Sequence, residues 1–294
     1  MEPVFSFNPS VEGQKKAIVT LTIGKRYEDM FSRYCMDSWI SYCKKYGYDL
    51  IAISHPLDNS ERAQKRSPAW QKLLILSQDW SSRYERLVWM DTDIIININY
   101  ALDISRDVPS SKVGAVNAFG IPTEEINLIA LERQYENLLL KNMPHIKNLT
   151  PGEYYKHRGI VSGAKLKQVV QTGVLVCSPK FHQAVFEHTY NSYEDTHGSD
   201  WNYEMPALSY ELLSNDSVHW VSTRFNNCVM DMISAFYPEL IRDNRPSYQQ
   251  FINAMTNIYE LSTFMHFAGC GNYMDEFCGA KSNPPPQRTR LLYI

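Results

Sequence analysis

The sequence has no long apolar run and no extended block of like charge. No segment approaches about 18 uninterrupted apolar residues, and the first residues, MEPVFSFNPSVEGQKK, contain no basic region followed by an apolar one. We therefore expect a soluble, cytoplasmic protein without a transmembrane segment, with peripheral membrane association left open. The 29 basic and 32 acidic residues give a formal charge of -3. This balance argues against nucleic acid as a partner.

Pairing motifs for cysteine are also missing. The six cysteines are scattered without any C-x-x-C pair, so neither a zinc ribbon nor a dithiol redox site is indicated. We expect reduced, mostly buried thiols, and near the tail Cys270 and Cys278 lie close enough in the sequence to raise the question of a pair.

Apolar, β-rich runs alternate with helical patterns in the first part of the chain. With 44% hydrophobic residues over 294 positions, the chain can form a substantial core. The expected elements are a strand in 15–24, a helix in 28–46, a strand in 47–54, a helix from Ser67–Pro68 onward and a strand in 85–90. This alternation predicts an α/β fold with a mostly parallel sheet and right-handed crossovers.

The second part of the chain is less regular. The expected strands are 112–119, 171–179, 218–226 and a short one within 262–272, and the expected helices are Ile126–Leu140, one beginning at Pro179, and 201–214. The segment Asn142–Lys167, with its prolines and glycines, is expected to be an irregular functional loop. No repeat and no linker divides the chain, so we expect one domain with an embellished C-terminal half.

A pair of aspartates follows the third predicted strand. In VWMDTDIIININ, Asp91 and Asp93 flank Thr92 between two apolar runs. In open parallel sheets, ligands bind at the carboxyl ends of the strands, where this pair would lie. Carboxylates there suit Mn²⁺ or Mg²⁺, which often complete their coordination with phosphate oxygens of a substrate. The alternative is a solvated turn in which Asp93 caps a helix.

Four motifs together carry a family resemblance. PAWQKLLIL, LVWMDTDIII, QTGVLV and MHFAG occur in this order, and they resemble the nucleotide-sugar-dependent glycosyltransferases of the GT-A fold. The nearest groups are the retaining glycogenin-like group (family 8) and the fungal α-galactosyl/mannosyl group (family 34). The resemblance runs from about Ala17 to Gly269. It implies a GT-A (Rossmann-like), mostly parallel central sheet flanked by helices.

The same resemblance implies an activity and a role for each half of the chain. A metal-dependent glycosyltransferase would transfer a hexose from a nucleotide sugar, UDP-linked by the family resemblance, to a glycan or another hydroxyl acceptor with retention. Residues 1–294 would form one domain, with a nucleotide-binding half (about 15–110), an acceptor-binding and metal-completing half (about 111–280) and an extended tail (281–294). The Asn142–Lys167 loop would then be an acceptor-binding or lid element.

The implied metal ligands are Asp91, Asp93 and His266 in HFAG. A neutral imidazole suits Mn²⁺ better than Mg²⁺, so Mn²⁺ is the first choice and Mg²⁺ the alternative. Without the resemblance, His266 would be read as a core histidine beside Phe264 and Phe267.

The residues implied to bind the nucleotide-sugar donor are Thr20, Leu21, Thr22, Trp70, Lys72, Asp91, Thr92 and Gly173. For Gly173 a physical reason exists, because glycine permits close approach of the backbone to a ligand. The alternatives are simple strand packing for the residues of the first strand and a solvated helix position for Lys72.

The implied catalytic residues are Glu204, Gln171 and Asp200. Glu204 in WNYEMPALS would face the sugar, with Asp200 as a neighbour that could substitute. An ordinary carboxylate in the first turn of a helix is the alternative for Glu204.

The chain departs from the glycogenin-like pattern after HFAG, where a basic residue normally faces the leaving diphosphate. The first one here is Lys281, so Lys281, Arg158, Lys165 or the metal alone would supply that charge. Inversion also stays open as a stereochemical outcome.

Two other functions remain as alternatives to a glycosyltransferase. A sugar-nucleotide nucleotidyltransferase is disfavoured because TIGKRYED has no G-x-G-x-R loop. A non-catalytic carbohydrate-binding scaffold would use the 6 tryptophans and 19 tyrosines for stacking.

Overall fold

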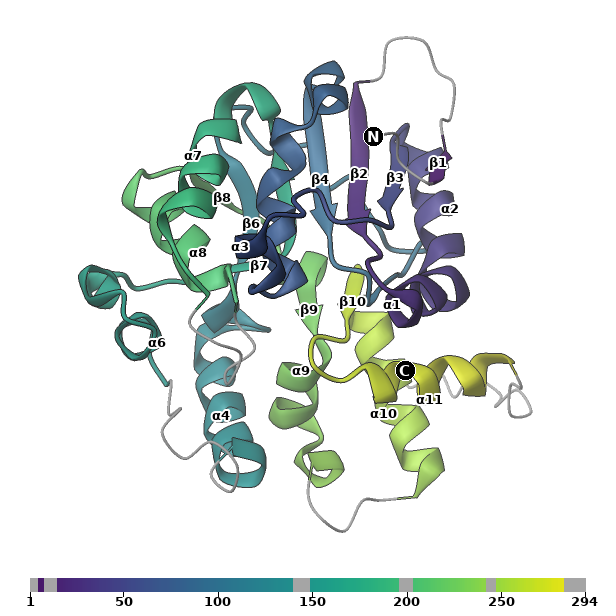
Figure 1. The fold of residues 1–294 in the computed structure, drawn as a ribbon. Coiled ribbons are helices and arrows are strands. Elements are labelled where there is room, and N and C mark those ends of the chain that lie inside the picture. The colour runs from purple at the N-terminus through teal and green to yellow at the C-terminus, as the bar shows by residue number, and fades with distance from the viewer. Residues whose placement is uncertain (1–4, 8–14, 140–148, 196–202, 242–246, 283–294) are drawn as a thin grey trace.

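The computed structural model describes residues 5–7, 15–139, 149–195, 203–241 and 247–282. Its main sheet has seven strands in the order β1-β3-β2-β4-β7-β6-β8 (Figure 1). Their bounds are β1 Phe5–Phe7, β2 Lys16–Leu21, β3 Asp49–Ile53, β4 Arg86–Met90, β6 Val113–Asn117, β7 Val170–Cys177 and β8 Val218–Trp220.

Most of these strands run in one direction. The pairs β2–β3, β2–β4 and β6–β8 are parallel, whereas β1 and β7 run antiparallel to their neighbours. The predicted α/β fold with a mostly parallel sheet is thus confirmed. Because β7 is reversed, its first residues lie at the same edge as the carboxyl ends of β2, β4 and β6.

A small second sheet continues from this edge. It contains β5 (Ile94–Ile96), β10 (Phe264–His266) and β9 (Asn227–Cys228), in that order. The chain passes from β4 to β5 through residues 91–93, and β10 pairs with β5 so that His266 lies opposite Ile94. The turn of the acidic pair therefore joins the two sheets.

Helices cover both faces of the main sheet (Figure 1). The α-helices are α1 Lys25–Met30, α2 Met36–Tyr46, α3 Glu61–Gln64, α4 Glu124–Gln134, α6 Pro151–His157, α7 Pro179–Ser192, α8 Met205–Ser214, α9 Val229–Phe236, α10 Tyr248–Leu261 and α11 Gly271–Ser282. Two π-helical segments, Phe31–Cys35 and Tyr135–Leu139, adjoin α1 and α4. Short 3₁₀ helices are Pro68–Ser77, Asp79–Arg83, Ala118–Gly120, Val161–Lys165, Thr223–Asn226 and Pro238–Ile241.

Two apolar cores lie on the two sides of the main sheet. One contains side chains from α2, α9, α10 and α11, and the other contains side chains from Pro68–Ser77, α7 and α8. All six cysteines are free thiols, and all but Cys278 are buried. None of the helices within the described ranges has the length and apolar character needed to cross a bilayer.

The segment after Ser67 is a helix, as predicted, but of the tighter 3₁₀ type. Ser67 caps its first turn by accepting a hydrogen bond from Ala69 N, and Pro68 occupies the first position. Trp70, Leu73 and Leu76 are buried. Their spacing of three matches the three residues per turn of a 3₁₀ helix, so all of them face the core.

The prediction for one segment was wrong. The predicted irregular loop Asn142–Lys167 contains α6, because Thr150 and Glu153 form a capping box and Pro151 occupies the first helical position. The loop's residues 142–148 lie outside the described part. The predicted extended tail (281–294) overlaps α11 at residues 281 and 282, since that helix continues to Ser282. Residues 283–294 are likewise outside the description, so the tail stays a prediction.

Candidate active site

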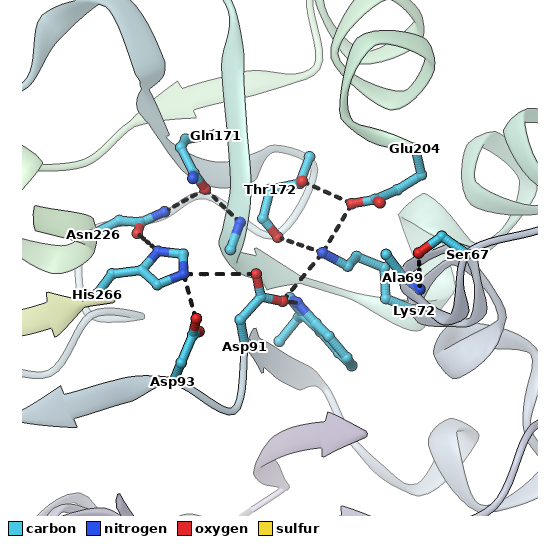
Figure 2. A network of polar contacts seen from close by, with 12 residues as sticks. Ser67, Ala69, Lys72, Asp91, Asp93, Gln171, Thr172, Glu204, Asn226 and His266 are labelled. Atoms are coloured by element: carbon cyan, nitrogen blue, oxygen red, sulfur yellow. Dashed lines mark hydrogen bonds and ion pairs between the residues drawn. The ribbon is translucent and has the colours of Figure 1, made fainter. Parts of the chain in front are cut away.

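Three side chains that can bind a metal converge at the carboxyl edge of the main sheet (Figure 2). Nε2 of His266 lies 3.1 Å from Oδ1 of Asp93 and 3.8 Å from Oδ2 of Asp91. One ligand atom from each residue falls within 4.8 Å of the others. The donor set is two carboxylates and an imidazole, a combination that suits a divalent ion such as Mn²⁺.

Backbone hydrogen bonds hold the acidic turn in place. Asp91 N donates to Gly173 O at 2.9 Å, and Asp93 O accepts from Phe267 N at 3.0 Å. The buried thiol of Cys35 donates to Thr92 O at 3.1 Å. The turn is therefore tied to β7 on one side and to the end of β10 on the other. Asp93 leads into a strand rather than capping a helix.

The ring of His266 occupies the space that a side chain at position 173 would need. A Cβ added at Gly173 would lie 2.4 Å from Cε1 and 2.9 Å from Nδ1 of His266. Close backbone approach was expected at this glycine, but the partner in the structure is the imidazole of a candidate ligand.

Lys72 connects Asp91 to Glu204. Its Nζ lies 3.2 Å from Oδ1 of Asp91 and 2.8 Å from Oε1 of Glu204. Burial lowers the pKa of Lys72, but the two carboxylates outweigh burial and raise it above its usual value. Lys72 is therefore charged at neutral pH. Its side chain is buried at the site, in contrast to the alternative of a solvated helix position.

Glu204 is buried immediately before α8. It accepts a hydrogen bond from Thr172 Oγ1 at 2.8 Å. Burial raises the pKa of this carboxyl, while Lys72 opposes that effect. The preceding residue, Tyr203, has φ 41°, in the left-handed region that non-glycine residues rarely adopt. Such backbone conformations cluster at functional sites.

The site carries more negative than positive charge. The carboxylates of Asp91, Asp93 and Glu204 face one ammonium and one imidazole. Burial lowers the pKa of His266, but Asp93 outweighs burial and raises it well above its usual value. Burial raises the pKa of Asp93, but His266 outweighs burial and holds it below its usual value. A divalent cation between His266 and the two aspartates would replace the proton on Nε2 of His266 and balance the charge of the carboxylates.

The predicted donor-binding residues fall into two groups. Lys72, Asp91, Thr92 and Gly173 belong to the site. Of the others, Thr20 and Leu21 lie in β2, Thr22 follows that strand, and Trp70 lies in the 3₁₀ helix Pro68–Ser77. Thr20 and Trp70 are almost completely buried, and the guanidinium of Arg66 covers the Trp70 ring at 4.5 Å.

The other residues predicted for the site are the catalytic candidates Gln171 and Asp200 and the basic candidates Arg158 and Lys165. Gln171 lies in the site, but its Oε1 accepts from Gly173 N and from Asn226 Nδ2, so the amide is already bound within the protein. Asp200 lies outside the described residues. The guanidinium of Arg158 is over the Tyr154 ring at 4.0 Å, and Lys165 is exposed. Within the described residues, Lys72 is the ammonium group that contacts the carboxylates.

Asn226 was not predicted from the sequence. Its Oδ1 lies 2.7 Å from Nδ1 of His266. No local motif marks this residue, because it reaches the site through the 3₁₀ helix Thr223–Asn226 and the pairing of β9 with β10.

The fold and the site together define a class: a mixed α/β domain with an Asp-Asp-His cluster at the carboxyl edge of its sheet. No protein-family model matches the sequence, and no curated protein sequence matches it. Solved structures with a similar chain path include a glycosyltransferase involved in the glycosylation of the major capsid of PBCV-1. It is 15% identical with a TM-score of 0.48, and the match covers 89% of this chain and 98% of that chain.

Two further structures are similar at lower scores. The galactosyltransferase LgtC, in complex with donor and acceptor sugar analogs, is 11% identical with a TM-score of 0.43, over 90% of this chain and 95% of that one. Core-mannan synthase A from Aspergillus fumigatus, in an Mn/GDP form, is 13% identical with a TM-score of 0.41, over 73% and 74%. At these identities and TM-scores, the similarity establishes no activity for this chain.

Proposed function

We propose that this protein is a metal-dependent glycosyltransferase that transfers a hexose from a nucleotide sugar to a hydroxyl acceptor. The observation that carries the proposal is the convergence of Asp91, Asp93 and His266 beside the buried Lys72–Glu204 pair. This arrangement joins a site for a divalent cation to a buried carboxylate at the edge where ligands of α/β sheets bind.

Asp91, Asp93 and His266 would hold the cation, with Mn²⁺ favoured over Mg²⁺ by the imidazole ligand. When bound, the cation supplies Lewis-acid stabilisation of the departing diphosphate. On this proposal the cation would itself offset the charge of the departing diphosphate, in place of the basic residue that the glycogenin-like pattern has after HFAG.

Glu204 would stabilise the positive charge that develops at the anomeric carbon. Lys72 and Thr172 fix its carboxylate by hydrogen bonds. A preorganised charge of this kind costs no reorganisation when the sugar reacts. The catalytic roles of Glu204, Gln171 and Asp200, the retention of configuration, the UDP moiety, the glycan acceptor and the cytoplasmic location stay predictions from the sequence.

The test is release of nucleoside diphosphate from a panel of sugar nucleotides, with Mn²⁺ or with EDTA. We expect metal-dependent release from one donor, reduced at least about 100-fold by Asp93→Ala. Asp107→Ala removes an exposed aspartate and serves as the control, with release like that of the wild type.

Other outcomes would support the competing functions. Release of pyrophosphate instead of nucleoside diphosphate would indicate a nucleotidyltransferase. If calorimetry detects no sugar-nucleotide binding and no product is released with metal and acceptors present, the protein is a scaffold and the proposal is wrong.

A further inference from the structure

The two ring nitrogens of His266 face different partners. Nε2 faces the aspartates, and Nδ1 lies 2.7 Å from Oδ1 of Asn226. Both His266 and Asn226 are almost completely buried. Cys228 Sγ is also near Nδ1, at 3.9 Å, but a thiol sulfur at that distance is a weak partner. Asn226 is therefore the main hydrogen-bond partner of Nδ1.

The orientation of the Asn226 amide follows from its other end. Nδ2 of Asn226 donates to Oε1 of Gln171 at 2.8 Å (Figure 2). The same oxygen accepts from Gly173 N at 2.5 Å. An oxygen that accepts from a backbone N–H presents no hydrogen to Asn226. Asn226 must then direct its NH₂ group at Gln171 and its oxygen at His266.

This orientation determines the tautomer of His266. An amide oxygen only accepts hydrogen bonds, so Nδ1 must carry a hydrogen. In the neutral ring, the lone pair then lies on Nε2, the nitrogen that faces Asp91 and Asp93. A lone pair next to two carboxylates is repelled by them unless a proton or a cation lies between.

We propose that Asn226, held by Gln171, is a positioning residue that fixes His266 in the tautomer whose Nε2 binds the divalent cation. This inference rests on the proposed metal site and adds to it a connection from β7 to the ligand. The hydrogen bonds run from Gly173 N to Gln171, on to Asn226 and then to His266. Groups that orient a metal-binding histidine in this way typically change metal affinity about 10–100-fold when they are removed.

Calorimetric titration of the whole chain with Mn²⁺ tests the inference. Asn226→Leu keeps the approximate volume and removes the acceptor, and we expect its Kd for Mn²⁺ to rise at least about tenfold. Asn226→Asp keeps an oxygen facing Nδ1 but loses the hydrogen bond to Gln171 Oε1, so we expect a smaller rise in Kd than in Asn226→Leu.

The neighbouring Asn227 provides a matched control. Asn227 is also buried, but its Nδ2 donates to Ser262 Oγ at 2.8 Å. Asn227→Leu therefore makes the same change one residue away without touching His266. We expect its metal affinity to equal that of the wild type even where its stability falls.

The tautomer itself is read by long-range ¹H–¹⁵N NMR of the wild-type protein loaded with diamagnetic Cd²⁺. We expect a protonated Nδ1 and a metal-shifted Nε2. A metal-bound Nδ1 would overturn the inference without any variant, so the test holds even if Asn226→Leu does not fold. Equal Mn²⁺ affinity in Asn226→Leu and wild type, or equal losses in Asn226→Leu and Asn227→Leu, would also overturn it. A wild type that binds neither Mn²⁺ nor Cd²⁺ contradicts the proposed metal site itself, and the inference with it.

Discussion

A lysine contacts acidic side chains at each of the two ends of the main sheet, half-buried at the amino end and buried at the carboxyl end, and the two arrangements differ in charge. At the amino end of β2, Lys16 Nζ lies 2.8 Å from Asp103 Oδ2. Hydroxyl groups of Tyr48 and Ser105 donate to the other oxygen of that carboxylate. One cation meets one anion, and the anion's remaining oxygen is hydrogen-bonded.

At the carboxyl end, Lys72 contacts Asp91 and Glu204, and Asp93 faces His266. Here the carboxylates outnumber the permanent cations. The balanced pair can only stabilise the folded chain, whereas the unbalanced cluster has capacity for an added cation. Substitutions at the two ends should therefore have different consequences.

The largest effect is expected for Lys72→Met. The change leaves the buried Glu204 without its cation, and breaking a buried pair from one side costs about 3–5 kcal/mol. Urea unfolding of the apo protein measures this loss. Adding Glu204→Gln to the same variant removes the unpaired charge and should recover part of the stability. If the double variant is no more stable than Lys72→Met, the charge is not the cause.

Binding of Mn²⁺ is expected to have the next largest effect. At a concentration of about 100 times Kd, a ligand that binds only the folded state stabilises it by about 2.7 kcal/mol. Thermal unfolding with Mn²⁺ and with EDTA should show this difference in the wild type and in Asp103→Asn, but not in Asp93→Ala. A shift that survives in Asp93→Ala would place the cation elsewhere.

Gly173→Ala should have a smaller effect on stability. The new Cβ would overlap with the His266 ring, and such overpacking costs about 1–3 kcal/mol. The stabilisation by Mn²⁺ should fall as well, because the ring must move. Gly279 in α11 has no atom within 4 Å of an added Cβ, so Gly279→Ala should be neutral or stabilise by up to about 1 kcal/mol.

The smallest effect is expected at the amino end. Asp103→Asn should cost about 1–2 kcal/mol and leave the Mn²⁺ response intact. Burial raises the pKa of Asp103, but hydrogen bonds from Lys16 and Tyr48 outweigh it and lower the pKa. The Lys16–Asp103 pair therefore contributes fully to stability above the pKa of Asp103 in the unfolded chain, about 3.9. This contribution is lost as the pH falls through the lower pKa of Asp103 in the folded protein. The difference in stability between the two proteins should therefore shrink as the pH falls through the lowered pKa of Asp103 in the folded state, which urea unfolding at a series of acidic pH values measures.

Much of the first half was predictable from local patterns. The strands β2, β3 and β4 lie within the predicted ranges because apolar runs of strand length are bounded by polar residues. The position of Asp91 and Asp93 at the carboxyl edge follows from that strand order. Whether these residues act as ligands stays a prediction.

Other features, such as helix α10 and Asn226, were not predicted from the sequence. The first has a local signal that was missed, and the second depends on tertiary contacts. Helix α10 was not predicted, although Ser247 and Gln250 form a capping box and its buried residues recur at helical spacing. Asn226 carries no such signal. Its contact with His266 depends on two strands, β9 and β10, that are paired in space and separated in sequence.

The pairing of β10 with β5 has a further consequence for biogenesis. His266 belongs to β10, whereas Asp91 and Asp93 precede β5, far earlier in the chain. A chain leaving the ribosome holds two carboxylates long before the imidazole is synthesised, and the non-local pairing that unites them forms late. The cation would thus bind tightly only to molecules folded from β4 through β10, and truncated or misfolded copies would lose it.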